Sequence, residues 1–205
     1  VRDYLVNRLH VKKLVIGYDH QFGKNREGSI DFLRDVCDTY GFEVIEISAQ
    51  EVNDVNVSST KVRNAIQEGD FELVKHYLGE PFELHGKVVR GQALGRQIGY
   101  PTANIDIGSD VKLMPKSGVY AINALLGDGM IVDGMMNIGV KPTIGDEDEQ
   151  SIEVHLFDFN QDLYDQFITV QLLSRFRDEQ KFDSIYDLKE QLLHDEMYIR
   201  TYFTL

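Results

Sequence analysis

The chain has 205 residues, of which 42% are hydrophobic and 27% are charged, close to ordinary globular usage. These values exclude a disordered, collagen-like or coiled-coil chain. The 21 basic and 34 acidic residues give a net charge of −13. Such a charge argues against a non-specific DNA or anionic-membrane binder, because that binding depends on neutralising phosphate charge. It does not exclude a small phosphorylated ligand held by a few local donors.

The sequence carries no sign of export. Cys37 is the single cysteine, so an internal disulfide cannot form. No apolar run approaches the roughly 20 residues of a membrane span, and no signal-peptide pattern opens the chain. We therefore expect a cytoplasmic protein that binds neither membrane nor nucleic acid. The helical spacing of Val1, Leu5 and Leu9, without an initiator Met, indicates a piece of a longer protein.

Strand and helix signals alternate over residues 1–78. The first three predicted elements are a strand, a helix and a strand: Leu14–Gly17, Ile30–Tyr40 and Phe42–Ile47. Two further helices follow capping side chains: one through Ile66 after Ser58-Ser59-Thr60, and one to Leu78 after Asp70. Alternation of this kind predicts a parallel sheet, which two strands cannot cover. We therefore expect residues 1–78 to be the C-terminal portion of a larger α/β domain, with exposed apolar surface that favours oligomerisation.

From residue 79 onward the pattern changes to short strands. The predicted strands are Phe82–Arg90, Gly118–Leu126, Met130–Asn137, Ile152–Phe159 and Phe167–Leu173. Hairpin turns are predicted at Gly127–Gly129 and Asn160–Asp162. Five or six antiparallel strands in about 95 residues favour a small closed barrel, which has no free sheet edge. A last helix is predicted with Asp183 as its cap, so residues 79–205 form the second domain.

The segment Gly86–Asn104 combines three basic residues with no acidic one. Its glycines recur every four residues, at Gly91, Gly95 and Gly99, and would let backbone N–H groups approach an anion. No Gly-Lys-Ser/Thr follows and no helix is expected there, which excludes a P-loop and a dinucleotide fingerprint. Thr102 and Asn104 offer oxygen atoms of the kind that bind Mg²⁺. A flexible glycine-rich loop between strands explains the same spacing.

Glu153 is the candidate catalytic carboxylate. In the run Ile152–Leu156, alternate residues face the core, so Glu153 and His155 share the opposite face. If Glu153 projects into an open barrel mouth, it could accept a proton from an attacking hydroxyl. The alternative is an outward, solvated glutamate, and His155 is expected to be a packing or surface residue. Aromatic residues near Phe182 could line a pocket for a flat ring, or simply pack in the core.

These motifs together resemble the riboflavin kinase family. The resemblance rests on Gly91–Asn104 with its Pro-Thr-Ala-Asn run, on Asn137–Thr143, and on Glu153–Leu156 followed by Asp158-Phe159 and Leu163-Tyr164. It covers roughly residues 79–205. It implies a split barrel of Greek-key type with about six antiparallel strands and a C-terminal helix, and it implies ATP, Mg²⁺ and riboflavin as ligands.

The resemblance also implies roles for individual residues. Glu153 would be the base for the ribityl 5′-hydroxyl of riboflavin, and Thr102 with Asn104 would bind the metal. The residues implied in ATP binding are Gly91, Gly95, Arg96, Gly99, Pro101, Thr102 and Asn104. Arg177 and Phe182 would contact the flavin.

Residues 1–78 are similar to the end of the FMN adenylyltransferase module of bacterial bifunctional FAD synthetases. The matching positions, a remnant of its site, are Gly17, Asp19, Gly23, Ser59, Thr60 and Arg63. That family's His-x-Gly-His motif is absent from the sequence, and His10 and His20 do not replace it. We therefore expect this chain to phosphorylate riboflavin but not to adenylylate FMN. The alternatives are a catalytically silent flavin- or nucleotide-binding regulatory module and, against the charge, an oligonucleotide-binding barrel.

Overall fold

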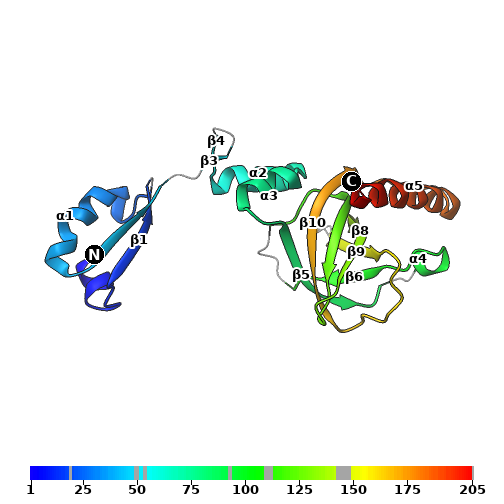
Figure 1. Ribbon diagram of the computed structural model, residues 1–205, viewed down its shortest axis with the longest axis horizontal. Coiled ribbons are helices and arrows are strands. Elements are labelled where there is room, and N and C mark those ends of the chain that lie inside the picture. Colours follow the sequence, from blue (N-terminus) through cyan, green and yellow to red (C-terminus); the bar gives the residue numbers. More distant parts are fainter. Residues whose placement is uncertain are drawn as a thin grey trace. The chain divides into compact units, whose positions relative to one another are not determined.

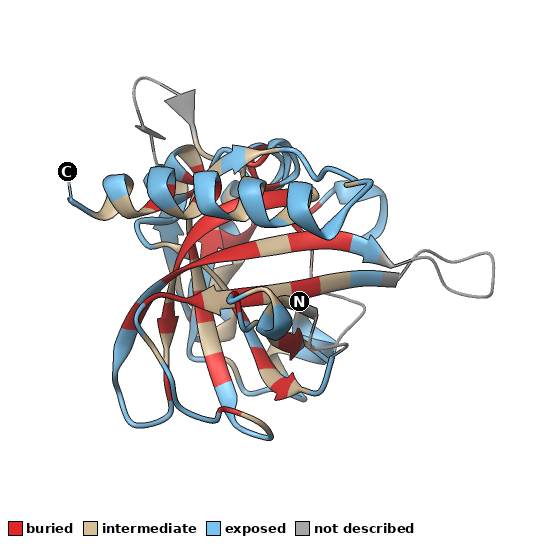
Figure 2. Cartoon of the chain, turned by 90° about the vertical axis from the view of Figure 1, so that its right-hand side faces the viewer, coloured by how far each residue is buried: buried red, intermediate tan, exposed pale blue. Residues whose placement is uncertain are grey.

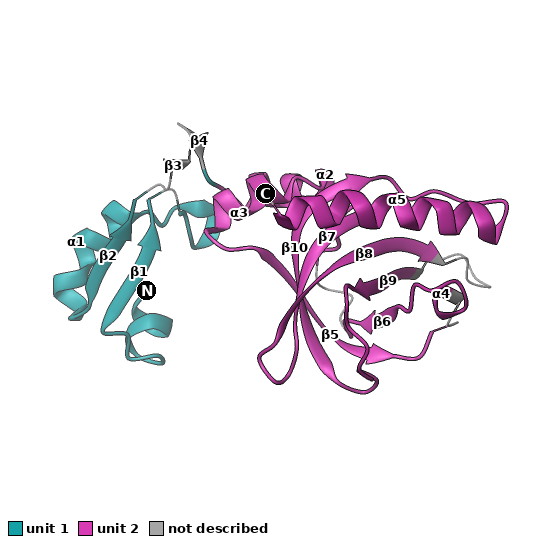
Figure 3. Cartoon of the chain, turned by 45° about the vertical axis from the view of Figure 1, so that its right-hand side comes forward, with its two compact units in different colours: residues 1–57 teal, residues 58–205 magenta. Residues whose placement is uncertain are grey.

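The structure is a computed structural model that describes residues 1–18, 20–48, 51–52, 55–91, 94–108, 113–141 and 149–204. The chain forms two compact units, Val1–Val57 and Ser58–Leu205 (Figure 3). This division between residues 57 and 58 reflects how the chain packs. The domain boundary predicted between residues 78 and 79 separates the parts that resemble two different families, and it stays a prediction.

The first unit is a β-α-β arrangement. Strand β1 (Lys13–Gly17) pairs in parallel with β2 (Glu43–Ile47), and α1 (Ile30–Tyr40) joins them. The unit also holds a π-helical turn, a 3-10 turn and a two-stranded ladder: Arg2–Val6, Lys24–Arg26, and β3 (Glu51–Val52) with β4 (Val55–Asn56). Val15 and Ile47 are about half exposed, at 55% and 50%. The predicted parallel pairing and the exposed apolar surface are both confirmed.

The second unit is a closed barrel of six antiparallel strands, as predicted (Figure 1). Its strands are β5 (Phe82–Val89), β6 (Ala103–Asp106), β7 (Gly118–Leu125), β8 (Ile131–Lys141), β9 (Glu149–Leu156) and β10 (Phe167–Arg177). Strands β7, β8 and β9 follow one another as neighbours, and β10 returns to lie beside β7. This order is a Greek key.

Two details of the predicted barrel are wrong. Asn160–Asp162 is not a hairpin turn, because β9 and β10 are not neighbours and residues 157–166 form a connection across the barrel. Strand β6 was not predicted, since its four residues directly follow Pro101-Thr102 and are too few to show a clear alternation.

Two helices that precede the first barrel strand in the sequence pack against the barrel. Helix α2 (Ser59–Glu68) starts at Ser58, and α3 (Phe71–Leu78) starts at Asp70, whose side chain accepts a hydrogen bond from Leu73 N. Their buried side chains join the same apolar cluster as the barrel interior: Ala65, Ile66, Phe71 and Val74 with Leu84, Tyr120 and Leu172. Helices α2 and α3 are therefore part of the barrel's core.

The C-terminal helix α5 (Ile185–Thr204) covers the outer wall of the barrel at β7 and β8. Its buried Ile199 packs with Val119 and Met135, while the opposite side of the helix is exposed (Figure 2). The cap is Ser184, whose hydroxyl accepts from Asp187 N, and not the predicted Asp183. Within the described residues, no helix is long and apolar enough to cross a membrane.

Helix α3 should contribute strongly to the stability of the barrel unit. Phe71 is 2% exposed and meets the ring of Tyr120 edge-on, with ring centroids 5.6 Å apart. We predict that Phe71→Ala lowers the free energy of unfolding of this unit by about 3–5 kcal/mol, through lost burial and a cavity. The matched control is Leu78→Ala at an exposed position of the same helix. Urea denaturation followed by circular dichroism measures both, and equal effects would contradict the shared core.

Candidate active site

One row of residues across the barrel wall forms the base of the candidate site. Strand pairing places Asn104 of β6 opposite Glu153 of β9, Glu153 opposite Asn137 of β8, Asn137 opposite Val119 of β7, and Val119 opposite Arg177 of β10. Residues directly opposite one another project from the same face of a sheet. The row crosses four inter-strand spacings, about 19 Å along the wall.

Glu153 lies on the outer wall of the barrel. Ile152, Val154 and Leu156 are buried in the barrel interior, which confirms the predicted alternation. The expected position of Glu153 in an open barrel mouth is wrong, because the alternate face of β9 points outward, toward a cavity that helix α5 also lines. His155 is a packing residue there, with Nδ1 2.8 Å from the carbonyl oxygen of Pro101.

This outer cavity has a volume of about 260 Å³. Besides the cross-strand row, it is lined by residues of the segments before β6 and after β10 and by helix α5, among them Gly95, Tyr100, Thr102, Glu179, Phe182 and Asp195. Burial, with help from the nearby Glu196 carboxylate, raises the pKa of Tyr100 to about 12. Its phenol therefore stays neutral at ordinary pH. The cavity walls thus combine apolar side chains, such as Ile98 and Leu192, with polar ones from the row and from the neighbouring segments.

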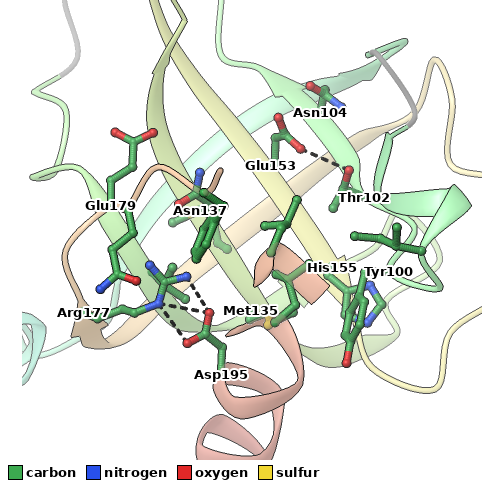
Figure 4. Close-up of a pocket in the computed structure, with 18 residues that line it drawn as sticks. Tyr100, Thr102, Asn104, Met135, Asn137, Glu153, His155, Arg177, Glu179 and Asp195 are labelled. Atoms are coloured by element: carbon green, nitrogen blue, oxygen red, sulfur yellow. Dashed lines mark hydrogen bonds and ion pairs between the residues drawn. The ribbon is translucent and has the colours of Figure 1, made fainter. Parts of the chain in front are cut away.

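Thr102 connects two cavities. Its hydroxyl donates a hydrogen bond to Glu153 Oε2 at 3.2 Å on the side of the outer cavity (Figure 4). Thr102 also lines a second cavity of about 420 Å³, together with Arg96, Pro101, Asp162 and Tyr164. The apolar wall of this second cavity includes the inward-facing residues Val88, Val154 and Leu156. The two cavities therefore share one lining residue, Thr102.

Close packing or backbone conformation requires glycine at the three glycine positions of the predicted anion loop. A Cβ on Gly91 would lie 2.2 Å from Asn104 Nδ2, and a Cβ on Gly95 would lie 2.1 Å from the carbonyl oxygen of Tyr100. Gly99 has a φ of +93°, which favours glycine. A short helix, α4 (Leu94–Gln97), follows, although no helix was expected there. Residues 92 and 93 lie outside the described residues.

The oxygen atoms near Glu153 suit a hard divalent cation. Thr102 donates its proton to Glu153, so the lone pairs of its oxygen remain available to a metal. Asn104 lies opposite Glu153 and adds an amide oxygen. Among the described residues no group of three or more His, Cys, Asp or Glu side chains could hold a metal. The donor set fits Mg²⁺ bound through few protein ligands plus substrate phosphates.

The structure places the other predicted residues as follows. Arg177 and Phe182 line the outer cavity with Glu153, whereas Gly91 and Gly99 line neither cavity. Gly17 and Gly23 belong to the first unit, and Ser59, Thr60 and Arg63 belong to helix α2 of the second. Asp19 lies outside the described residues.

Several lining residues were given no role in the site from the sequence. Asn137, Glu179 and Asp195 line the outer cavity, and Tyr164 lines the second one, where the guanidinium carbon of Arg90 lies 4.6 Å from its ring centroid. Asn137 stands on an alternating strand, which could have indicated its face. The others depend on how distant segments meet.

The family model for riboflavin kinase matches residues 78–203. The chain belongs to the riboflavin kinase family. A second model, for FAD synthetase, matches residues 1–61.

Curated relatives are named for both activities. The bifunctional riboflavin kinase/FMN adenylyltransferase of Buchnera aphidicola subsp. Schizaphis graminum is 38% identical over 207 residues, covering 100% of this chain and 66% of that protein. The protein of the same name from Escherichia coli K12 is 40% identical over 206 residues, covering 100% of the chain and 64% of that protein. The chain therefore spans 64–66% of the length of these relatives.

A crystal structure titled as a macrolide-efflux protein from Streptococcus pneumoniae has a related fold. It superposes with a TM-score of 0.78 at 36% identity, over 91% of this chain and 60% of that one. The likeness supports the folds of the individual units described above.

The contact between Gly91 and Asn104 can be tested without any ligand. We predict that Gly91→Ala displaces the Asn104 amide and lowers the free energy of unfolding by about 1–3 kcal/mol, through overpacking. Gly127→Ala is the control, because nothing lies within 4 Å of a Cβ there. Denaturation measures stability, and the side-chain amide resonances of Asn104 report its displacement. An unshifted Asn104 in a fully stable Gly91→Ala variant would contradict the packing.

Proposed function

We propose that this chain is an ATP-dependent riboflavin kinase, which transfers the γ-phosphoryl group of ATP to the 5′-hydroxyl of riboflavin. The observation that carries the proposal is the meeting of two cavities at Thr102, whose hydroxyl is bonded to Glu153. A kinase must hold two substrates so that one hydroxyl group faces one terminal phosphate. Membership of the riboflavin kinase family supports the same reaction.

Charge assigns one substrate to each cavity. The outer cavity holds Glu153, Glu179 and Asp195 against Arg177, which is paired with Asp195. A polyanion would be repelled there, whereas an uncharged flavin would not. The second cavity has a single acid, Asp162, against Arg96 and against Arg90, whose guanidinium lies over the Tyr164 ring, and this balance suits a nucleotide better. We therefore place riboflavin in the outer cavity and ATP in the second, with Arg96 of the glycine segment beside its phosphates.

The reaction then occurs beside Thr102. The 5′-hydroxyl oxygen attacks the γ-phosphorus, the bond between that phosphorus and the β–γ bridging oxygen breaks, and ADP leaves. Glu153 accepts the proton of the attacking hydroxyl and orients it. Mg²⁺, bound at Thr102 and Asn104, would supply charge neutralisation for the phosphates. Arg177 and Phe182 contact the flavin ring, and a cytoplasmic location would supply ATP.

The role of Glu153 can be tested by substitution. Glu153→Gln keeps the shape and the acceptor for Thr102 but removes the base, so we expect kcat to fall by about 10²–10⁴-fold. Riboflavin affinity should change little, because the base acts in the transition state. Formation of ADP and FMN measures turnover, and quenching of flavin fluorescence measures binding. Glu190→Gln, an exposed position of α5, is the control.

Two results would count against the proposal. If Glu153→Gln retains near-full kcat, the assignment of the base is wrong. If the unaltered chain binds flavin but forms no FMN with Mg·ATP, it is the silent binding module instead.

A further prediction concerns FAD. This chain has the FAD synthetase match at residues 1–61 but no His-x-Gly-His motif to bind nucleotide phosphates. We expect it to form no FAD from FMN and ATP, in samples where it converts riboflavin to FMN. Radiolabelled ATP gives the readout, and labelled FAD would overturn this expectation. We propose that the longer protein of which such a chain is part carries both activities, as its relatives are named.

A further inference from the structure

Asp195 is the one buried charged side chain among the described residues, with 6% of its surface exposed. It projects from helix α5 into the lining of the outer cavity. Its Oδ1 accepts hydrogen bonds from Arg177 Nε and from Gln191 Nε2, both at 2.9 Å. Its Oδ2 accepts from Arg177 Nη2 at 2.6 Å. The carboxylate is therefore fully engaged in holding Arg177.

Arg177 is fixed on two sides. Asp195 takes one edge of its guanidinium, and Nη1 donates to the carbonyl oxygen of Asp178 at 2.9 Å. Among the described residues, these contacts leave one N–H on each terminal nitrogen for a ligand. Figure 4 shows the pair at the opposite side of the cavity from Thr102 and Glu153. Arg177 also ends the cross-strand row that begins at Asn104.

Stability alone does not explain this pair. Apolar side chains of similar volume usually stabilise a buried site as well as an ion pair does, because the ions must lose their hydration. Apolar neighbours such as Ile199, Val119 and Met135 pack close by. What an ion pair adds is direction, since a bidentate carboxylate fixes the plane of a guanidinium.

We propose that Asp195, braced by Gln191, is a positioning residue that holds the Arg177 guanidinium toward the dione edge of the flavin ring. The inference rests on the proposed function. With the reacting hydroxyl at Glu153, the ring lies toward the other end of the row, at Arg177. The ring's carbonyl oxygens accept hydrogen bonds, and Arg177 offers two donors whose charge Asp195 neutralises. The site thus binds an uncharged polar edge without attracting a polyanion.

The test uses riboflavin and lumiflavin, which carries the ring but lacks the ribityl chain. For Asp195→Asn we expect the dissociation constants of both flavins to rise about tenfold, because Arg177 loses its charged anchor. We expect the KM for riboflavin to rise by a similar factor, while kcat and the KM for ATP stay within about twofold. This is the pattern expected when a lost contact is equally strong in the ground state and the transition state. Flavin fluorescence and steady-state FMN formation give these values. Glu190→Gln on the same helix should change none of them.

Gln191→Met decides the matter if Asp195→Asn does not fold. It keeps the side-chain length but removes the donor to Asp195, so lumiflavin should bind about threefold more weakly. The positioning role would be overturned if a folded Asp195→Asn variant binds lumiflavin as tightly as the unaltered chain. If Asp195→Asn does not fold, the same result with Gln191→Met would overturn it. The kinase proposal would survive that result, because it fails only if the unaltered chain forms no FMN from riboflavin and Mg·ATP.

Discussion

The register of β9 between β6 and β8 determines the geometry of the whole site. It places Glu153 between Asn104 and Asn137, and the neighbouring pairings extend the row to Arg177. A slip of one residue would exchange Glu153 with Val154 and turn the carboxylate into the barrel interior. The buried side chains of Ile152, Val154 and Leu156 oppose that slip, since each would move to the outer wall. The barrel core therefore fixes the geometry of the candidate site as well as the fold.

The same wall separates the two proposed substrates. Inward-facing residues of β9 contribute to the second cavity, and outward-facing ones line the outer cavity. Thr102 is shared because it stands just before β6, where the strand begins and both sides are accessible. Helix α5 completes the outer cavity and provides Asp195. Strand β10 closes the barrel and places Arg177 on the same wall as Glu153. The proposed site for the flavin ring is thereby held at a fixed distance from the proposed site of phosphoryl transfer.

Local patterns predicted much of this arrangement. The alternation around Glu153 and the oxygen-bearing Thr102 and Asn104 could be predicted, because each depends on a few consecutive residues, whereas Arg177 and Phe182 were expected from the family resemblance. Asp195 and Tyr164 could not, since a buried carboxylate on a helix or a ring in a connection gains its role only through distant partners. The connection through Asn160–Asp162 shows the same limit. Its polar residues are typical of a hairpin turn, but the Greek key places the following strand three positions away around the barrel.

The proposed reaction requires riboflavin in the outer cavity and ATP in the second cavity. A crystal structure of the chain with ADP, Mg²⁺ and FMN would test this arrangement in one measurement. We expect ADP in the second cavity beside Arg96 and Tyr164, and the flavin ring in the outer cavity beside Arg177. We also expect the FMN phosphate and the metal at Thr102, within reach of Glu153. Nucleotide density in the outer cavity, or a flavin phosphate remote from Thr102, would contradict this arrangement.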